Sequence, residues 1–335
     1  MKKSNNKQNI CTRCIMDYSD TEIAFNEKGI CNHCVRYDTI LDSRIIIDKK
    51  EEKLNALINK IKKFSSKDGY DCIIGVSGGV DSTYVAYLCK QKGLNPLAIH
   101  FDNGWNSELA VKNIENCLEI LDIDLVTYVI EWDYFKEIQK AFLYSSTPDG
   151  EIPTDHAINA QLFNEANRRG IKYIINGMNF ATESMNVRMW SYGHSDWTYI
   201  KNILKSFSTI KKFKKYPHFS IFQLILNVFW RRKKVVSILN YTDFNKDEAM
   251  EVIKNKLKWV YYGGKHYESI YTRFYQGYFL PIKFNIDKRR GHFSDLIRSN
   301  QMSRTQALEL IKTDPYPNES LKKEDFDFVL KKFDL

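Results

Sequence analysis

Short apolar runs and amphipathic helical patterns alternate through the first half of the chain. Four apolar runs have the length of buried strands: 71–76, 96–101, 125–130 and 171–175. Five helical patterns accompany them, with apolar residues recurring every three or four positions: 49–66, 83–92, 108–121, 132–144 and 156–169. Strands that alternate with helices of this length predict βαβ units around a parallel, twisted sheet, and therefore an α/β fold.

The pattern changes towards both ends of the chain. Residues 9–36 carry four cysteines and little periodicity, whereas the chain becomes basic and aromatic after residue 185 and helical from Lys246 onward. A length of 335 residues also suggests about two domains plus a small module. We predict three parts: a cysteine module over 1–45, an α/β domain over 46–196 and a mostly helical region over 197–335.

Positive charge is concentrated in one segment. The chain has 50 Lys and Arg against 41 Asp and Glu, a formal net charge of +9. No acidic residue lies between Asp196 and Asp243, and the lysines and arginines of 201–234 account for the whole excess. The remainder is near neutral, which argues against a uniformly basic nucleic-acid binder. We therefore expect no nucleic-acid partner.

The basic segment surrounds the longest uncharged stretch, residues 216–230. This stretch is too short and too polar to span a bilayer, so we expect a buried core helix with solvated basic ends. A helix lying on an acidic membrane is the alternative, which leaves open a peripheral membrane contact through 201–234. The first ten residues lack the apolar core of a signal peptide, so we expect a cytoplasmic protein.

The cysteines predict a metal site. Two C-x-x-C pairs, Cys11 with Cys14 and Cys31 with Cys34, are separated by a spacing typical of four-thiolate zinc sites. Four thiolates leave zinc no open position, so the predicted role is structural, with a redox or iron–sulfur role as the alternative. The other cysteines lie in strand and helix patterns and are expected to be packing residues: Cys72, Cys89 and Cys117.

A glycine-rich turn follows the first strand. Residues 77–82 read S-G-G-V-D-S, directly before a helix. Gly78 and Gly79 allow the backbone to approach a ligand, and the free N–H groups of the helix start favour phosphate. Ser77 and Ser82 add hydroxyl donors, and Asp81 adds a carboxylate suited to Mg²⁺. The turn has neither the lysine of a Walker A loop nor the G-x-G-x-x-G pattern of dinucleotide sites.

This turn resembles the phosphate loop of the PP-loop ATP pyrophosphatases, a superfamily that includes NAD synthetases and tRNA-thiolating enzymes. The resemblance implies that ATP is cleaved between its α and β phosphates. Residues 177–183, G-M-N-F-A-T-E, are similar to the G-T-D-H-A-A-E stretch of NAD synthetases. This second resemblance implies that Gly177 lines the nucleotide site and that Glu183 shares Mg²⁺ with Asp81. Asp102, at the end of the second strand, falls where relatives contact the nucleoside.

A longer pattern is similar to the N-acetyl sugar amidotransferases of bacterial surface-polysaccharide and nonulosonic-acid pathways. It comprises the cysteine module, the loop and three further stretches: 153–157, 263–269 and 284–290. This family is understood to adenylylate the acetamido oxygen of a nucleotide sugar and to replace it with nitrogen from ammonia. Within these stretches we expect Lys265, Lys288 and Arg289 to stabilise phosphate charge, and His156 to orient the sugar or move a proton. Solvated surface charges and a structural helix-start histidine are the alternatives.

The same resemblance implies a separate glutaminase. The second residue is lysine, so an N-terminal catalytic cysteine is absent, and ammonia has to come from a partner. The basic segment 201–234 could dock that partner, an acidic membrane or the anionic sugar nucleotide. Two other functions compete: a PP-loop tRNA sulfurtransferase, and a non-catalytic zinc-ribbon protein that binds nucleic acid.

Overall fold

The computed structural model describes residues 10–185 and 187–335. The first nine residues of the predicted cysteine module, including Lys2, lie outside the described residues. Among those described, no helix is both long enough and apolar enough to cross a membrane.

The centre of the protein is a five-stranded sheet with the order β3-β2-β1-β4-β5. Every neighbouring pair is parallel, as the alternating pattern predicted. The strand bounds are Cys72–Gly75 (β1), Pro96–Asp102 (β2), Leu125–Val129 (β3), Tyr173–Asn176 (β4) and Lys234–Ser237 (β5). The α/β fold class is therefore confirmed.

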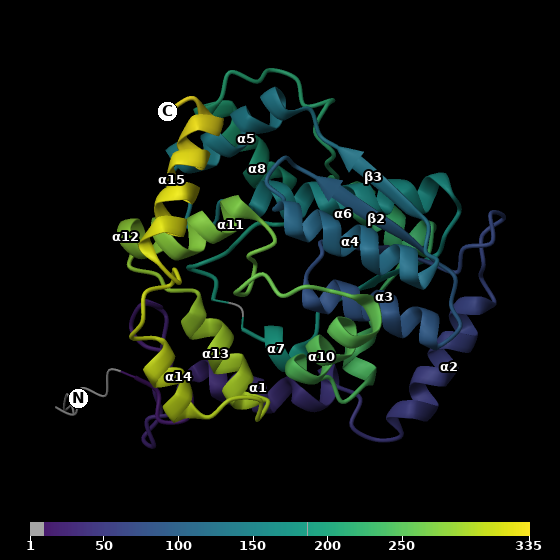
Figure 1. Ribbon diagram of the computed structural model, residues 1–335, viewed down its shortest axis with the longest axis horizontal. Helices are drawn as coiled ribbons and strands as arrows, with labels where there is room; N and C mark the ends of the chain where they lie inside the picture. The colour runs from purple at the N-terminus through teal and green to yellow at the C-terminus, as the bar shows by residue number, and fades with distance from the viewer. Residues whose placement is uncertain (1–9, 186) are drawn as a thin grey trace.

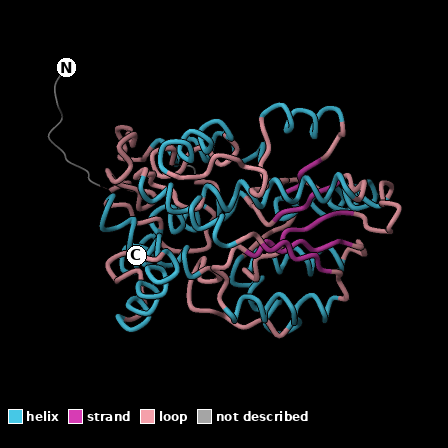
Figure 2. The backbone as a smooth tube through the Cα atoms, turned by 90° about the horizontal axis from the view of Figure 1, so that it is seen from above, coloured by secondary structure: helices cyan, strands magenta, loops and turns pink. Residues whose placement is uncertain are grey.

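Helices cover both faces of the sheet (Figure 2). Four of them share one hydrophobic core with the first face: α2 (Lys50–Lys62), α3 (Val80–Gln91), α4 (Glu108–Leu121) and α10 (Lys246–Leu257). The second face packs against α6 (Ile152–Arg168), and α5 (Trp132–Tyr144) and α8 (Trp197–Phe207) continue that layer. Successive side chains of a strand point to opposite faces of the sheet. Ile73 of β1 therefore packs in the core with α6, whereas Cys72 and Ile74 pack in the core on the first face.

The fifth strand was not predicted. Residues of β5 come from the segment that we had assigned to the mostly helical region, and they pair with β4 from Tyr173↔Lys234 to Asn176↔Ser237. The strand has only four residues, and its first residue, Lys234, ends a run of arginine and lysine. Only two apolar residues follow in the strand, too few to give the pattern of a buried strand. A short edge strand of this kind is recognised only through its partner.

The strand order creates a switch point between β1 and β4. The chain proceeds from β1 to β2 and β3 on one side and returns to β4 on the other. Loops leaving the carboxyl ends of β1 and β4 consequently diverge and leave a crevice, where parallel α/β sheets bind ligands. The S-G-G-V-D-S turn follows β1, and residues 177–183 follow β4.

The C-terminal third is helical and packs against the rest of the chain. In Figure 1, α15 (Glu319–Phe333) lies beside α11 (Ile270–Phe274) and α5, whereas α13 (Arg289–Arg298) lies beside α1 (Asn32–Arg44) and α14 (Arg304–Leu310) beside α13. One hydrophobic core joins α5, α11 and α15 to the four-cysteine module. The remaining short elements are α7 (Phe180–Glu183), α9 (Ile221–Ile225), η1 (Leu226–Trp230), η2 (Ile238–Tyr241), η3 (Tyr275–Phe279) and α12 (Leu280–Phe284).

The uncharged stretch 216–230 is not the buried core helix that we expected. Tyr216 and Phe219 are buried, but the helix formed by α9 and η1 leaves most of its apolar side chains in solvent. The expectation rested on composition alone. Only two side chains of this helix, Leu224 and Asn227, pack inward.

Candidate phosphate-binding site and four-cysteine cluster

The turn after β1 has a backbone that only glycine adopts easily. Gly78 has a φ of +79°, and a Cβ at this position would lie 2.6 Å from the carbonyl oxygen of Ala110 in α4. Gly79 is the N-cap of α3 and has no side chain to occupy the first free N–H groups of the helix. The turn therefore presents unpaired backbone donors at the positive end of a helix dipole, an arrangement suited to phosphate.

Side chains hold this turn in shape. The Ser77 and Ser82 hydroxyl oxygens lie 3.2 Å apart, and the Gly79 N–H donates to Ser77 Oγ at 3.3 Å. The buried indole Nε1 of Trp259 donates to the Gly78 carbonyl at 2.8 Å. Trp259 belongs to the segment after α10, and nothing in the sequence near it signalled a contact with the loop.

Asp81 and Glu183 follow β1 and β4, the two strands at the switch point, and lie near enough for the charge of Glu183 to act on Asp81. Gly177 lets the segment after β4 pack closely against the start of α3, because a Cβ at this position would lie 3.1–3.2 Å from Asp81 and from the Ser82 amide nitrogen. Asp81 Oδ1 is buried and has no hydrogen-bond partner. Its Oδ2 lies 3.9 Å from Lys246 Nζ, and Glu183 Oε1 lies 3.5 Å from Lys265 Nζ. An unpartnered buried carboxylate oxygen next to a second carboxylate fits a hard cation such as Mg²⁺.

Burial and neighbouring charges act on the pKa of Asp81, and the net effect is a rise. Burial raises the pKa of Asp81, and Glu183 raises it further, while the positive charges of Lys246 and Lys265 oppose the rise. A bound cation would offset the same desolvation cost. Lys246 was not among the predicted site residues. It opens α10 behind the Asn245 cap, and the sequence contained no sign that this helix starts beside the loop.

The segment 262–268 lies over the phosphate loop. Glu268 Oε1 and the Tyr262 hydroxyl lie 3.4 and 3.5 Å from the position that a Cβ of Gly79 would take. Glu268 Oε2 is buried without a partner, so Glu268 is a third carboxylate with a free oxygen here. Burial alone would raise the pKa of Glu268, but hydrogen bonding and charge from His266 outweigh that effect and lower it. The sequence pattern had marked 263–269 without giving Glu268 a role.

A second polar cluster lies around the start of α6. Asp149 Oδ2 lies 3.4 Å from both Lys288 Nζ and His194 Nε2, and His194 Nε2 is also 3.3 Å from Asp155. Burial raises the pKa of Glu151 to about 8, with Asp155 and Asp149 adding to the rise. Thr154 binds Asn103 just beyond β2, so the cluster faces the same edge of the sheet as the phosphate loop. Of this group, only Lys288 had been predicted.

The other predicted residues are placed differently. Asp102 ends β2 and accepts a hydrogen bond from the Gly104 N–H at 2.8 Å. Arg289 binds Asp287 and the carbonyls that follow α14, notably that of Thr313 at 2.8 Å, and so is held away from the loop. This placement favours a structural role for Arg289.

His156 lies in an aromatic core. Its Nδ1 is 2.7 Å from the carbonyl oxygen of His194, and its Nε2 accepts the Phe219 N–H at 3.3 Å. The ring stacks on Phe219 with centroids 4.5 Å apart, and burial lowers its pKa to about 4. Both nitrogens are occupied, so the structural alternative is the better description of His156.

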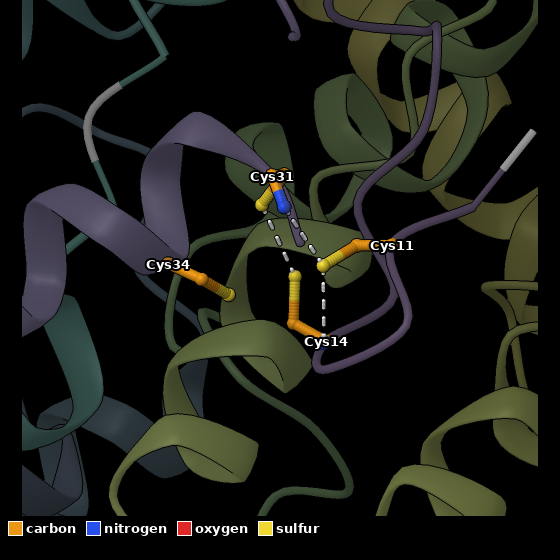
Figure 3. Close-up of side chains that lie close together, drawn as sticks. All are labelled: Cys11, Cys14, Cys31 and Cys34. Atoms are coloured by element: carbon orange, nitrogen blue, oxygen red, sulfur yellow. Dashed lines mark hydrogen bonds between the residues drawn. The ribbon is translucent and has the colours of Figure 1, made fainter. Parts of the chain in front are cut away.

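The four cysteines of the two C-x-x-C pairs converge (Figure 3). All four ligand sulfurs, on Cys11, Cys14, Cys31 and Cys34, lie within 4.8 Å of one another and are buried. Backbone N–H groups already point at them, including Cys31 N–H to Cys11 Sγ at 3.2 Å. The arrangement is compatible with a metal site of four thiolates. The three remaining cysteines are buried, as expected of packing residues.

The cysteine module is fastened to the C-terminal helices. Arg304 donates to the carbonyl oxygens of Cys11 and Cys14 at 2.8 and 3.0 Å, and Arg290 donates to the Ile15 carbonyl at 3.0 Å. Arg298, buried beside Asp295, directs Nη1 at Cys34 Sγ. These arginines lie 250 or more residues from the cysteines, and the sequence had given them no role.

Two regions of the chain match known protein families. Residues 51–173 match the NAD synthase family, and residues 268–335 match the family described as "LPS biosynthesis protein WbpG-like, C-terminal domain". The first match includes the phosphate loop, and the second includes Glu268, the arginines and α11 to α15. The chain is thus similar to NAD synthases around its phosphate loop and to WbpG-like proteins over its C-terminal helices. The NAD synthase match ends before residues 177–183, so the roles inferred there for Gly177 and Glu183 stay predictions.

Individual proteins also resemble parts of this chain. A tRNA(Ile)-lysidine synthase from Chlamydia pneumoniae is 29% identical over 118 residues, 32% of this chain. The chain spans about a third (35%) of the length of that relative. Among solved structures, the NH3-dependent NAD synthetase from Campylobacter jejuni is 18% identical, with a TM-score of 0.32 over 63% of this chain and 93% of its own. The U34-tRNA thiolase NcsA from Methanococcus maripaludis is 14% identical, with a TM-score of 0.34 over 91% and 88%.

Proposed function

We propose that this protein is an ATP-dependent amidotransferase that converts the acetamido group of an N-acetylated nucleotide sugar into an acetamidino group. The NAD synthase match supports an ATP-using ligase, and the WbpG-like match supports surface-polysaccharide biosynthesis, such as that of an O-antigen or a nonulosonic acid. The observation that carries the proposal is the free N-terminus of α3 next to the unpartnered oxygen of Asp81.

The chemistry requires two bond exchanges. An amide oxygen is a poor leaving group, so ammonia alone does not displace it. In the first exchange the acetamido oxygen attacks the α-phosphorus of ATP, and the bond to the β-phosphate oxygen breaks to release pyrophosphate. In the second, ammonia adds to the amide carbon, loses a proton, and expels AMP as the C–O bond breaks. The site has to hold the reactants in line and stabilise the departing pyrophosphate.

The residues divide these tasks by position. The free backbone N–H groups at the start of α3 and the hydroxyls of Ser77 and Ser82 would bind the pyrophosphate. Asp81, Glu183 and Glu268 offer oxygens for Mg²⁺, which would neutralise charge on the phosphates. Lys246 and Lys265, the two cations nearest these carboxylates, would stabilise charge as it develops.

The polar cluster at the start of α6 is the candidate acceptor site. Asp149, Glu151 and Asp155 face the same sheet edge as the loop and would favour ammonium or a sugar hydroxyl. Lys288 is better placed here than at the phosphates, because it pairs with Asp149. Zinc in the four-cysteine cluster would hold the module on α13 and α14 and would take no part in the reaction.

Three further expectations belong to this proposal: ammonia from a separate glutaminase, a cytoplasmic location and no nucleic-acid partner. The competing function is tRNA modification, which the lysidine synthase likeness favours. Against a sulfurtransferase, the cysteines outside the four-cysteine cluster are all buried, and the last of them is Cys117. Thiol chemistry needs an accessible thiolate, and burial raises the pKa of Cys117 to about 12.

Mass spectrometry of the sugar tests the proposal. Candidate diacetamido nucleotide sugars would be incubated with the protein, ATP, Mg²⁺ and ammonium. We expect a product lighter by the difference between O and NH, formed with ammonium but not with glutamine alone. A tRNA product, with the nucleotide sugars unchanged, would instead establish the competing function. Turnover with glutamine alone would contradict the need for a separate glutaminase.

A further inference from the structure

The helix formed by α9 and η1 exposes an unusual amount of apolar surface. Trp230, Phe222 and Phe229 are 83%, 79% and 76% exposed. Four aliphatic side chains of the same ten residues are also exposed: Ile221, Ile225, Leu226 and Val228. We call these seven side chains the apolar ridge. Exposed aromatic and aliphatic residues in one continuous stretch mark an interaction surface.

The ridge is fixed to the protein by its opposite side. The buried Asn227 accepts a hydrogen bond from Asn167 of α6 at 2.9 Å, and its carbonyl accepts the Lys233 N–H at 2.9 Å. Lys233 Nζ then binds the carbonyls of Ala166 and Ile171 at 2.8 and 2.7 Å. Leu224 packs against the α6 core. The helix is thus anchored through Asn227 and Leu224, and the seven side chains of the ridge face away from the fold.

Cations precede and follow the ridge along the chain. Lys211, Lys212 and Lys214 are exposed before it, and Arg231 and Arg232 are exposed directly after it. The segment between Asp196 and Asp243 contains no acidic residue, and its Lys215 pairs with Glu131 from outside the segment. The segment therefore combines protruding aromatic side chains with an excess of positive charge, and its complement is a surface that is apolar inside and anionic at its boundary.

We propose that the apolar ridge docks the protein on the surface of an anionic lipid bilayer. A helix with Trp, Phe and Leu on one side and basic neighbours is typical of interfacial membrane contacts. The aromatic side chains enter the boundary between headgroups and acyl chains, and the flanking lysines and arginines bind the acidic headgroups. A flat bilayer can surround a protruding helix on all its exposed sides without a preformed groove. The inference does not depend on the proposed ATP chemistry.

Vesicle flotation with the full chain tests this inference. The probes are vesicles of phosphatidylcholine with phosphatidylglycerol, and vesicles of phosphatidylcholine alone. We expect flotation with the anionic vesicles, weaker flotation with the neutral ones, and loss of binding when NaCl rises from about 0.1 M to about 0.5 M. Trp230 should report the same event as a blue shift of its fluorescence on vesicle addition.

Variants separate the two components of the contact. Phe229→Ser/Trp230→Ser should lower partitioning into anionic vesicles by about tenfold or more. Lys211→Glu/Lys212→Glu/Lys214→Glu should remove the preference for anionic lipid. The control is Ile282→Ser, which alters a side chain 68% exposed on α12, outside the ridge, and should bind like the wild type.

Three results would overturn the inference. Wild-type protein that stays with the solution in the presence of anionic vesicles has no such contact. Equal flotation of Phe229→Ser/Trp230→Ser would place the contact elsewhere. A wild-type dimer in light scattering that this variant converts to a monomer, without vesicle binding by either form, would assign the ridge to an interface between copies of the chain.

Discussion

The backbone of Gly78 gives the sharpest stability prediction, that of Gly78→Ala. A residue with a Cβ is disfavoured at a φ of +79° by about 1–2 kcal/mol. The same Cβ would lie 2.6 Å from the Ala110 carbonyl oxygen, and overpacking of this kind costs about 1–3 kcal/mol more. We therefore expect Gly78→Ala to lower the free energy of unfolding by about 2–5 kcal/mol.

Urea unfolding followed by circular dichroism measures this loss. Gly75→Ala is the matched control, because it adds the same methyl group three residues earlier, at the end of β1. Its Cβ would meet Leu162 at an ordinary 3.6 Å, and Gly75 is not among the residues with a positive φ. The control should change stability by less than about 1 kcal/mol. Equal stability of the two variants would refute the geometry that we assign to the loop.

Three further predictions concern other parts of the protein. Arg304→Met removes the hydrogen bonds to the carbonyls of Cys11 and Cys14, so the variant should lose zinc to a chromogenic chelator about tenfold faster than the wild type. An unchanged rate would show that Arg304 does not stabilise the four-cysteine cluster. Burial raises the pKa of Glu151 to about 8, so the wild-type free energy of unfolding should fall as pH rises from about 4.5 to about 8. Urea unfolding at pH 5 and pH 9 should show a smaller fall in Glu151→Gln, and an equal fall would remove Glu151 as its source. His156→Ala should lower the free energy of unfolding by about 2–5 kcal/mol, and with it the melting temperature, yet leave kcat of the folded protein unchanged. A fall in kcat would indicate that His156 takes part in the reaction.

The sequence predicted local structure more completely than the relations between distant segments. The helix expected over 108–121 matches α4 to the residue, and the parallel strands before residue 176 follow the predicted apolar runs. Such elements are encoded by their own periodicity. β5 carries no such signal, because four half-exposed residues become a strand only by pairing with β4.

In the candidate site, too, the local motifs were predicted and the contacts between distant segments were not. The S-G-G-V-D-S turn and the cysteine pairs are local motifs, and their geometry follows the prediction. Lys246 and Trp259 reach the loop from α10 and the segment behind it, which only the packed fold brings there. Conversely, the sequence predicted Arg289 to stabilise phosphate charge, but Arg289 opens α13 and binds Asp287 just before that helix. Charge alone does not distinguish a ligand-binding arginine from a structural one.

The products of ATP turnover test the central claim most directly. The protein would be incubated with ATP, Mg²⁺, ammonium and an N-acetylated nucleotide sugar, and the nucleotides resolved by ion-exchange chromatography, with Asp81→Asn in parallel. We predict AMP and pyrophosphate in equal amounts, and their loss in the folded Asp81→Asn variant, because the loop would bind the phosphates that leave together. ADP with inorganic phosphate, or undiminished AMP formation by Asp81→Asn, would contradict the role given to the turn between β1 and α3.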